Sequence, residues 1–148
     1  MVQWSYPDSL WVQVVIKAAS VSVLAEGIDA LDLRGRAVLE VVRITDADDL
    51  LEAVQFVFTD GQSLTLTVWT DWKLVVELRS EAVVPDYLWP VEDRTRTAIE
   101  GFSGTGKVIG EVVPGLNDAG TLVEVRFTLD GCLLLVKSFG GDLILELG

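Results

Sequence analysis

Hydrophobic and polar residues alternate along several stretches of this chain. Apolar residues occupy every second position of 64–68 and of 123–129, which is the pattern of a strand with one buried face. Asp60-Gly61 and Asp130-Gly131 each separate two such runs. Asp-Gly favours the positive φ angles of a tight turn, so both pairs predict β-hairpins.

This alternation predicts a mainly β fold, with a β-rich α+β fold as the alternative. We expect two four-stranded antiparallel meanders that pack as a sandwich or as one curled sheet, with one or two short helices. The predicted strands of the first meander are 37–44, 53–58, 63–69 and 73–78. Those of the second meander are 107–113, 122–129, 132–138 and 143–147.

The two predicted meanders also resemble each other in sequence. GRAVLEVV at 35–42 is similar to GKVIGEVV at 106–113, and each is followed by an Asp-Gly pair and then by a Glu-Leu pair. The order of these shared features predicts an internal duplication, with repeats at about 35–78 and 106–147. The chain of 148 residues has the length of one domain, so 1–148 is interpreted as a single domain.

Two segments lie outside the repeats, at 1–34 and 79–105. For residues 9–19 the spacing of apolar residues slightly favours a helix, but β-branched residues at alternate positions also suit a strand. In the connecting segment, Pro85 and Pro90 exclude a continuous helix, and a short helical turn is expected within 93–102.

Composition excludes several kinds of chemistry. The chain has no histidine and one cysteine, Cys132, which rules out Ser-His-Asp and Cys-His triads, His-based metal sites, Cys-based zinc sites and an intrachain disulfide. We therefore expect no catalytic residues, no metal and no cofactor. Cys132 stands beside three leucines and is interpreted as a small buried hydrophobe.

Charge and hydropathy bear on partners and location. Eleven basic and 23 acidic residues give a net charge of −12, which would repel nucleic acid. Polar residues interrupt the apolar stretch 10–25, so it predicts neither a signal peptide nor a membrane span. These features, with the single cysteine, favour a soluble cytoplasmic protein. Seven arginines against four lysines give soft support for a GC-rich bacterial source.

One glycine-rich stretch has part of a phosphate-binding motif. Residues 101–107 read GFSGTGK, but Val108 stands where the motif needs Ser or Thr, and the flanking residues do not predict a strand before it and a helix after it. We interpret 101–107 as a plain glycine-rich loop. Nucleotide or small-molecule binding there remains the alternative.

Carboxylates offer two further hypotheses. Asp46, Asp48, Asp49 and Glu52 are interpreted as a solvated acidic turn, with a contact surface for a basic partner as the functional alternative. The repeat-related pairs Glu40/Glu111 and Glu77/Glu146 could serve acid–base catalysis only if they converged in a cleft. We expect them instead to face solvent or the boundary between the repeats.

Two tryptophans close to an aspartate suggest a binding surface. Trp69 continues the polar face of its predicted strand, and Asp71 and Trp72 lie in or beside the following turn. Exposed tryptophans dominate many protein interfaces, while carboxylates at the rim attract basic partners. The alternative is that Trp69 covers the edge of the core beneath the 79–105 connection.

These observations favour a non-catalytic, acidic protein-binding module that binds a basic partner protein. The residues expected to bind this partner are Trp69, Asp71, Trp72, Asp46, Asp48 and Asp49. Toxin-neutralising immunity proteins of bacteria share this general character, and the partner would then be a basic toxin domain. The alternatives are an enzyme or small-molecule-binding protein, and a structural subunit whose apolar faces form an oligomer. The apolar sheet faces also leave room for a homodimer.

Overall fold

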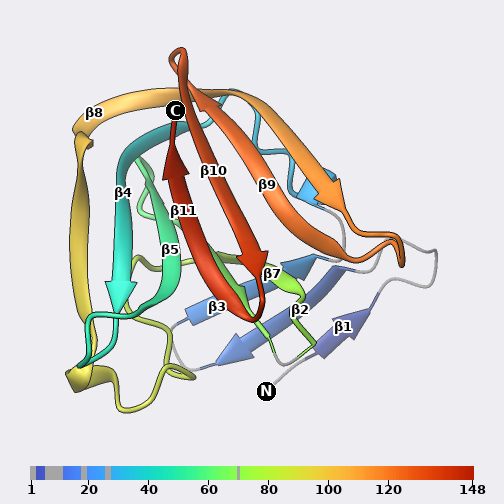
Figure 1. Ribbon diagram of the computed structural model, residues 1–148. Helices are drawn as coiled ribbons and strands as arrows, with labels where there is room; N and C mark the ends of the chain where they lie inside the picture. The colour runs from blue at the N-terminus through green and yellow to red at the C-terminus, as the bar shows by residue number, and fades with distance from the viewer. Residues whose placement is uncertain (1–2, 6–11, 18–19, 26–27, 70) are drawn as a thin grey trace.

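In the computed structural model, which describes residues 3–5, 12–17, 20–25, 28–69 and 71–148, the chain forms a mainly β protein (Figure 1). Eleven strands lie in the order β1-β2-β3-β7-β6-β5-β4-β8-β9-β10-β11, and each neighbouring pair is antiparallel. The strands are β1 (Gln3–Ser5), β2 (Val12–Lys17), β3 (Ser20–Ala25), β4 (Ala37–Thr45), β5 (Leu51–Phe58), β6 (Ser63–Val68), β7 (Leu74–Arg79), β8 (Thr95–Leu116), β9 (Leu122–Leu129), β10 (Cys132–Phe139) and β11 (Asp142–Leu147). The described residues include two short 3-10 turns, η1 (Ile28–Leu31) and η2 (Val91–Asp93).

The long strand β8 joins the two meanders. Its first part, from Thr95 to Val108, pairs with β4, and its second part, from Ile109 to Leu116, pairs with β9. Figure 1 shows β8 rising beside β4 and then arching over to run beside β9. As a result, one continuous sheet folds back on itself, and β9–β11 cover one face of β5–β7.

The core lies between these two layers. Alternate residues of β5, β6 and β7 point into it, and they meet alternate residues of β9, β10 and β11. At its centre the rings of Phe56 and Phe127, both fully buried, lie with their centroids 4.5 Å apart and tilted by 49°. The predicted alternation in 64–68 and 123–129 therefore marks residues that face each other across the core.

A β-bulge adjusts β4 to the same core. Val38 pairs with Phe58 and Glu40 with Val57, so Leu39 is an extra residue on β4. The bulge brings both Val38 and Val41 to the core, although they are three residues apart. Leu39 is 40% exposed.

The other face of β4–β7 is also buried, which the sequence did not predict. Val42, Ile44, Ala53 and Val57 pack there against apolar residues of the segment between β7 and η2. Polar side chains of β5, β6 and β7 share this face: Gln55, Ser63, Thr65, Thr67, Glu77 and Arg79. We call residues 80–94, which cover this face, the strap.

Several predictions are confirmed. The chain is mainly β, and the 60–61 and 130–131 pairs lie in turns. Seven of the eight predicted strands are present to within a few residues, whereas the strand predicted at 107–113 is part of the much longer β8. Asp130 and Gly131 have φ angles of 45° and 84°, as a two-residue hairpin turn requires. Gly61 has a φ of 92°, which closes the other turn. The duplication of the two meanders stays a prediction.

Three expectations are wrong. Within 9–19, where a helix was slightly favoured over a strand, residues 12–17 form strand β2, because pairing with β1 and β3 prevails over the helical spacing. Residues 9–11 and 18–19 lie outside the described residues. Residues 95–102 belong to β8, so the helical turn expected within 93–102 is η2 at 91–93. Residues 101–107 are likewise part of β8 and not a loop.

We expect the Phe56–Phe127 contact to carry much of the stability. Phe127→Ala should lower the free energy of unfolding by about 3–5 kcal/mol, because it removes a fully buried ring and leaves a cavity between the layers. Urea denaturation measures this loss. Phe127→Leu, which keeps most of the volume, is the control and should cost roughly half as much or less. Equal losses for the two variants would contradict a packing role for the ring.

Candidate functional site

A cleft with a volume of about 470 Å³ opens at one end of the sandwich. Figure 1 shows that β4 and β10 both end on this side of the molecule. Four segments line the cleft: the β4–β5 turn, the end of β6, the strap, and the β10–β11 turn. The lining residues are Asp46, Leu50, Leu51, Glu52, Thr67, Val68, Trp69, Tyr87, Leu88, Arg94, Gly141, Asp142 and Leu143.

The acidic turn between β4 and β5 forms one wall. Asp46 Oδ1 accepts hydrogen bonds from the backbone N–H groups of Asp48 (2.8 Å) and Leu50 (3.0 Å). Asp49 has a left-handed φ of 64°, which aspartate tolerates better than most residues. Asp46 therefore shapes the turn and lines the cleft, whereas Asp48 and Asp49 are exposed beside it.

The β6–β7 turn presents two tryptophans. The backbone N–H of Trp72 donates to the carbonyl of Trp69 at 2.9 Å, and Trp72 has a φ of 63°. Asp71 Oδ1 accepts the Lys73 N–H at 3.3 Å. The exposed fractions are 49% for Trp69, which lines the cleft, and 60% for Trp72.

Trp72 packs against the β10–β11 turn of the second meander. A Cβ atom placed on Gly141 would lie 3.1 Å from Trp72 Nε1, and Gly141 has a φ of 88°. Glycine is therefore required at 141 both by backbone conformation and by the approach of the indole. This contact holds the β6–β7 and β10–β11 turns side by side at the mouth of the cleft.

The structure thus brings some of the predicted residues together. Asp46 and Trp69 line the same cleft, and Trp72 lies at its edge against Gly141. Asp48, Asp49 and Asp71 are exposed on the two neighbouring turns.

Sequence reasoning missed the strap's contribution. Arg94 Nε donates to Glu52 Oε2 at 2.8 Å, and both side chains are largely buried in the cleft wall. Tyr87 and Leu88 also line the cleft, as does Thr67 from β6. The prolines of 79–105 indicated an irregular connection, but no sequence pattern showed which sheet face it covers.

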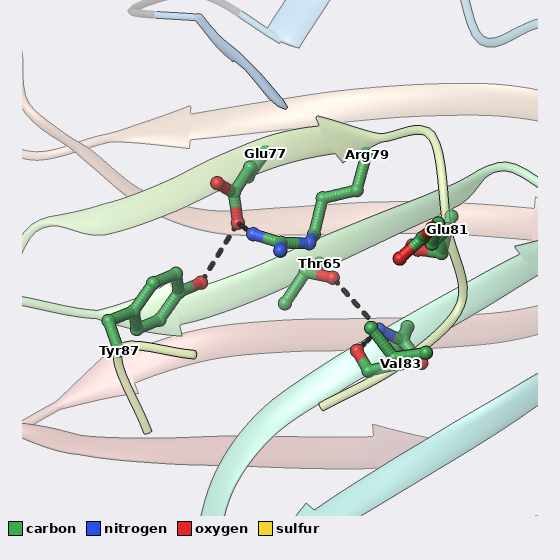
Figure 2. Close-up of polar contacts among 8 residues, drawn as sticks. Thr65, Glu77, Arg79, Glu81, Val83 and Tyr87 are labelled. Carbon is green, nitrogen blue, oxygen red and sulfur yellow. Dashed lines mark hydrogen bonds and ion pairs between the residues drawn. The ribbon is translucent and has the colours of Figure 1, made fainter. Parts of the chain in front are cut away.

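Beneath the strap lies a buried polar network (Figure 2). Arg79 Nη1 donates to Glu77 Oε1 at 2.9 Å, and the Tyr87 hydroxyl donates to the same oxygen at 3.0 Å. Glu77 and Arg79 are only 7% and 6% exposed. The expectation that Glu77 faces solvent or the boundary between the repeats is therefore wrong, because the strap encloses this face of β7.

The environment of Tyr87 shifts its titration. Although 43% of the residue is exposed, its hydroxyl points inward to Glu77. Burial of the hydroxyl raises the pKa of Tyr87 well above its usual value of 10.0, and the Glu77 carboxylate raises it further. Arg79 and the Thr67 hydroxyl lower it in part.

A second set of hydrogen bonds ties the strap to the sheet. Gln55 Nε2 donates to the Val83 carbonyl at 2.9 Å and to Thr65 Oγ1 at 3.2 Å, while its Oε1 accepts from Arg96 Nη2 at 2.8 Å. The Ser63 hydroxyl donates to the Glu81 carbonyl at 2.7 Å. The polar residues of this face therefore satisfy strap backbone groups that would otherwise be buried without partners.

The hydroxyl of Thr67 is different from its neighbours. Thr67 is 4% exposed and lines the cleft, yet its Oγ1 makes no hydrogen bond of standard geometry with any described residue, although it lies near Tyr87. An unsatisfied buried hydroxyl costs stability.

The geometry gives little support to nucleotide binding at 101–107 or to acid–base catalysis by a pair of carboxylates. The glycine-rich stretch 101–107 runs within β8, with left-handed φ angles at Gly101 and Gly106, so it does not precede a helix N-terminus. Of the carboxylate pairs, Glu77 is bound to Arg79, and Glu146 lies 2.7 Å from Lys137 Nζ in an ion pair. Within the described residues, no three histidine, cysteine or acidic side chains form a group that could hold a metal ion.

Comparisons with protein-family models, with curated proteins and with solved structures found no match for this chain. Among the described residues, no helix is both long enough and apolar enough to cross a membrane.

Removing the Thr67 hydroxyl should stabilise the protein. Thr67→Val is expected to raise the free energy of unfolding by about 1 kcal/mol, since it replaces an unsatisfied buried hydroxyl by a methyl group. Thr65→Val, two residues earlier on the same face, is the matched control and should lower it by about 1 kcal/mol, because it breaks the bond from Gln55. Urea denaturation of both variants measures the difference, and a destabilised Thr67→Val protein would contradict this reading.

Tyr87 should make stability fall at high pH. Because its pKa is raised on folding, the unfolded chain loses the tyrosine proton first, so the contribution is complete below about pH 10 and is lost as pH rises above it. Unfolding free energies measured at about pH 8 and about pH 11 should therefore differ more for the wild type than for Tyr87→Phe. An identical pH dependence of the two proteins would show that the hydroxyl does not titrate as described.

Proposed function

We propose that the protein is a non-catalytic binding module that docks a basic partner protein at the cleft end of the sandwich. The observation that carries this proposal is the combination of exposed aromatic side chains and carboxylates on turns that adjoin one cleft. Trp69 and Trp72 supply the aromatic part. Asp46, Asp48, Asp49 and Asp71 supply the acidic part.

Further large apolar side chains adjoin the same cleft along the chain. Leu50 lines it and is 63% exposed. Trp89 follows the lining residue Leu88 and is 78% exposed, and Phe139 pairs with the lining residue Asp142 and is 71% exposed. Such side chains are costly to leave in water, and exposed aromatic residues provide much of the affinity of protein interfaces.

Charge supports a basic partner. The net charge of the chain is −12, and the two turns beside the cleft carry aspartates that are exposed to solvent. A field of this sign accelerates the encounter with a cationic protein and disfavours acidic ones. The partner class we propose is a cationic toxin domain, which this protein would neutralise by occupying its functional surface.

Exchanging the charges beside the cleft should slow association with the partner. Asp48→Lys combined with Asp49→Asn keeps a residue that tolerates the left-handed φ at 49. We expect the association rate to fall about tenfold at low salt and the loss to shrink as salt rises. Trp72→Ala should instead speed dissociation and weaken binding by roughly thirtyfold, or about 2 kcal/mol.

The partner is first isolated with the wild-type protein as bait, and rates are then measured by surface plasmon resonance. Glu100→Lys combined with Glu111→Gln makes the same change in net charge at exposed positions of β8 that do not line the cleft. This control should leave the kinetics nearly unchanged. If folded Trp72→Ala and Asp48→Lys/Asp49→Asn proteins bind as the wild type does, the cleft end is not the interface.

A further inference from the structure

We propose that the cleft receives one arginine side chain of the partner, with its guanidinium held between Trp69 and the carboxylates of Asp46 and Asp142. This inference rests on the proposed function and specifies the partner's anchoring group. It follows from the charges, the aromatic wall and the hydrogen-bonding groups of the cleft.

The charges of the cleft are not balanced. Three carboxylates line it, from Asp46, Glu52 and Asp142, against one cation, Arg94. Arg94 and Glu52 form an ion pair at 2.8 Å, which cancels their charges. Two carboxylates therefore remain for a positively charged ligand.

Both remaining carboxylates have oxygens available. The two backbone hydrogen bonds to Asp46 end on Oδ1, and within the described part of the chain no group donates to its Oδ2. Asp142 stands at the start of β11, is exposed, and likewise makes no side-chain hydrogen bond with a described residue. A guanidinium has five N–H donors and can reach acceptors on two sides at once.

The apolar lining suits a guanidinium better than an ammonium group. Trp69, Val68, Leu88 and Leu143 line the cleft together with the carboxylates. A guanidinium is flat, weakly hydrated and stacks on aromatic rings, whereas a lysine ammonium is compact and strongly hydrated. Thr67 also lines the cleft.

The protein already contains this arrangement elsewhere. The Cζ atom of Arg36 lies 3.8 Å from the centroid of the Phe58 ring. Its Nη2 donates to Asp60 at 3.0 Å and to Gln62 at 2.8 Å. An arginine is thus held between an aromatic face and a carboxylate, as we propose for the partner's arginine in the cleft.

The test uses three blocked tripeptides as probes: acetyl-Gly-Arg-Gly-amide, its lysine counterpart and its citrulline counterpart. Citrulline has the shape of arginine without the charge. Titration of the ¹⁵N-labelled full chain should shift the Trp69 indole N–H and the amides of Thr67 and Leu143 with the arginine peptide. The lysine peptide should bind several-fold more weakly, and the citrulline peptide should give no shifts at these positions.

Two double variants test whether the cleft carboxylates bind the arginine peptide. Asp46→Asn combined with Asp142→Asn keeps the Oδ1 acceptor that shapes the acidic turn, and should weaken the arginine peptide about tenfold. Glu100→Gln combined with Asp118→Asn removes the same charge from exposed positions that do not line the cleft, and should change the affinity less than twofold. The amide spectrum of each variant verifies that it is folded.

Several outcomes would overturn the proposal: equal binding of the arginine and citrulline peptides, equal losses in the two variant pairs, or tighter binding of free L-arginine than of the blocked peptide. Failure here is separable from failure of the proposed function, because the protein partner is measured by surface plasmon resonance and the peptide by the chemical shifts of the labelled chain. If the partner depends on Trp72 while the arginine peptide shifts nothing, the docking surface stands and the arginine anchor is wrong.

Discussion

The structure depends on burying the apolar face of one meander against that of the other. Neither β5–β7 nor β9–β11 could remain in water with its alternate Val, Leu and Phe residues uncovered, and the Phe56–Phe127 contact marks where the two faces meet. The bend of β8 makes this possible without breaking the sheet. The cleft is a consequence, since the two layers and the strap leave a gap where their turns meet.

Local patterns in the sequence predicted the elements whose structure is decided by neighbouring residues. The alternation in 64–68 and the Asp130-Gly131 pair were sufficient, because strand faces and tight turns depend on short-range periodicity and backbone preference. For 12–17 the sequence left helix and strand open, because the deciding partners are β1 and β3, and this pairing prevails over a weak helical spacing. The length of β8 was missed because its glycines resemble those of a loop.

The sequence predicted only part of the candidate site, because several contacts of the site join residues that are far apart in the chain. Trp69 and Trp72 stood out through their size and their place beside a turn, and the acidic turn stood out through its composition. Glu52–Arg94 and Glu77–Tyr87 join residues that are distant in the sequence. Only the path of the strap over the outer face of β4–β7 brings them together. The contact of Trp72 with Gly141 is similarly long-range.

The sharing of β8 by both layers has a consequence for how the protein folds. Its first part pairs with β4, whose partner residues lie 50 to 71 positions earlier in the chain, whereas its second part pairs with β9 across a short turn. Contacts between distant residues raise the contact order and slow folding. A nascent chain that ends before β9 would leave the apolar face of β5–β7 uncovered during synthesis, so this chain should reach its native state late and then in a single cooperative step.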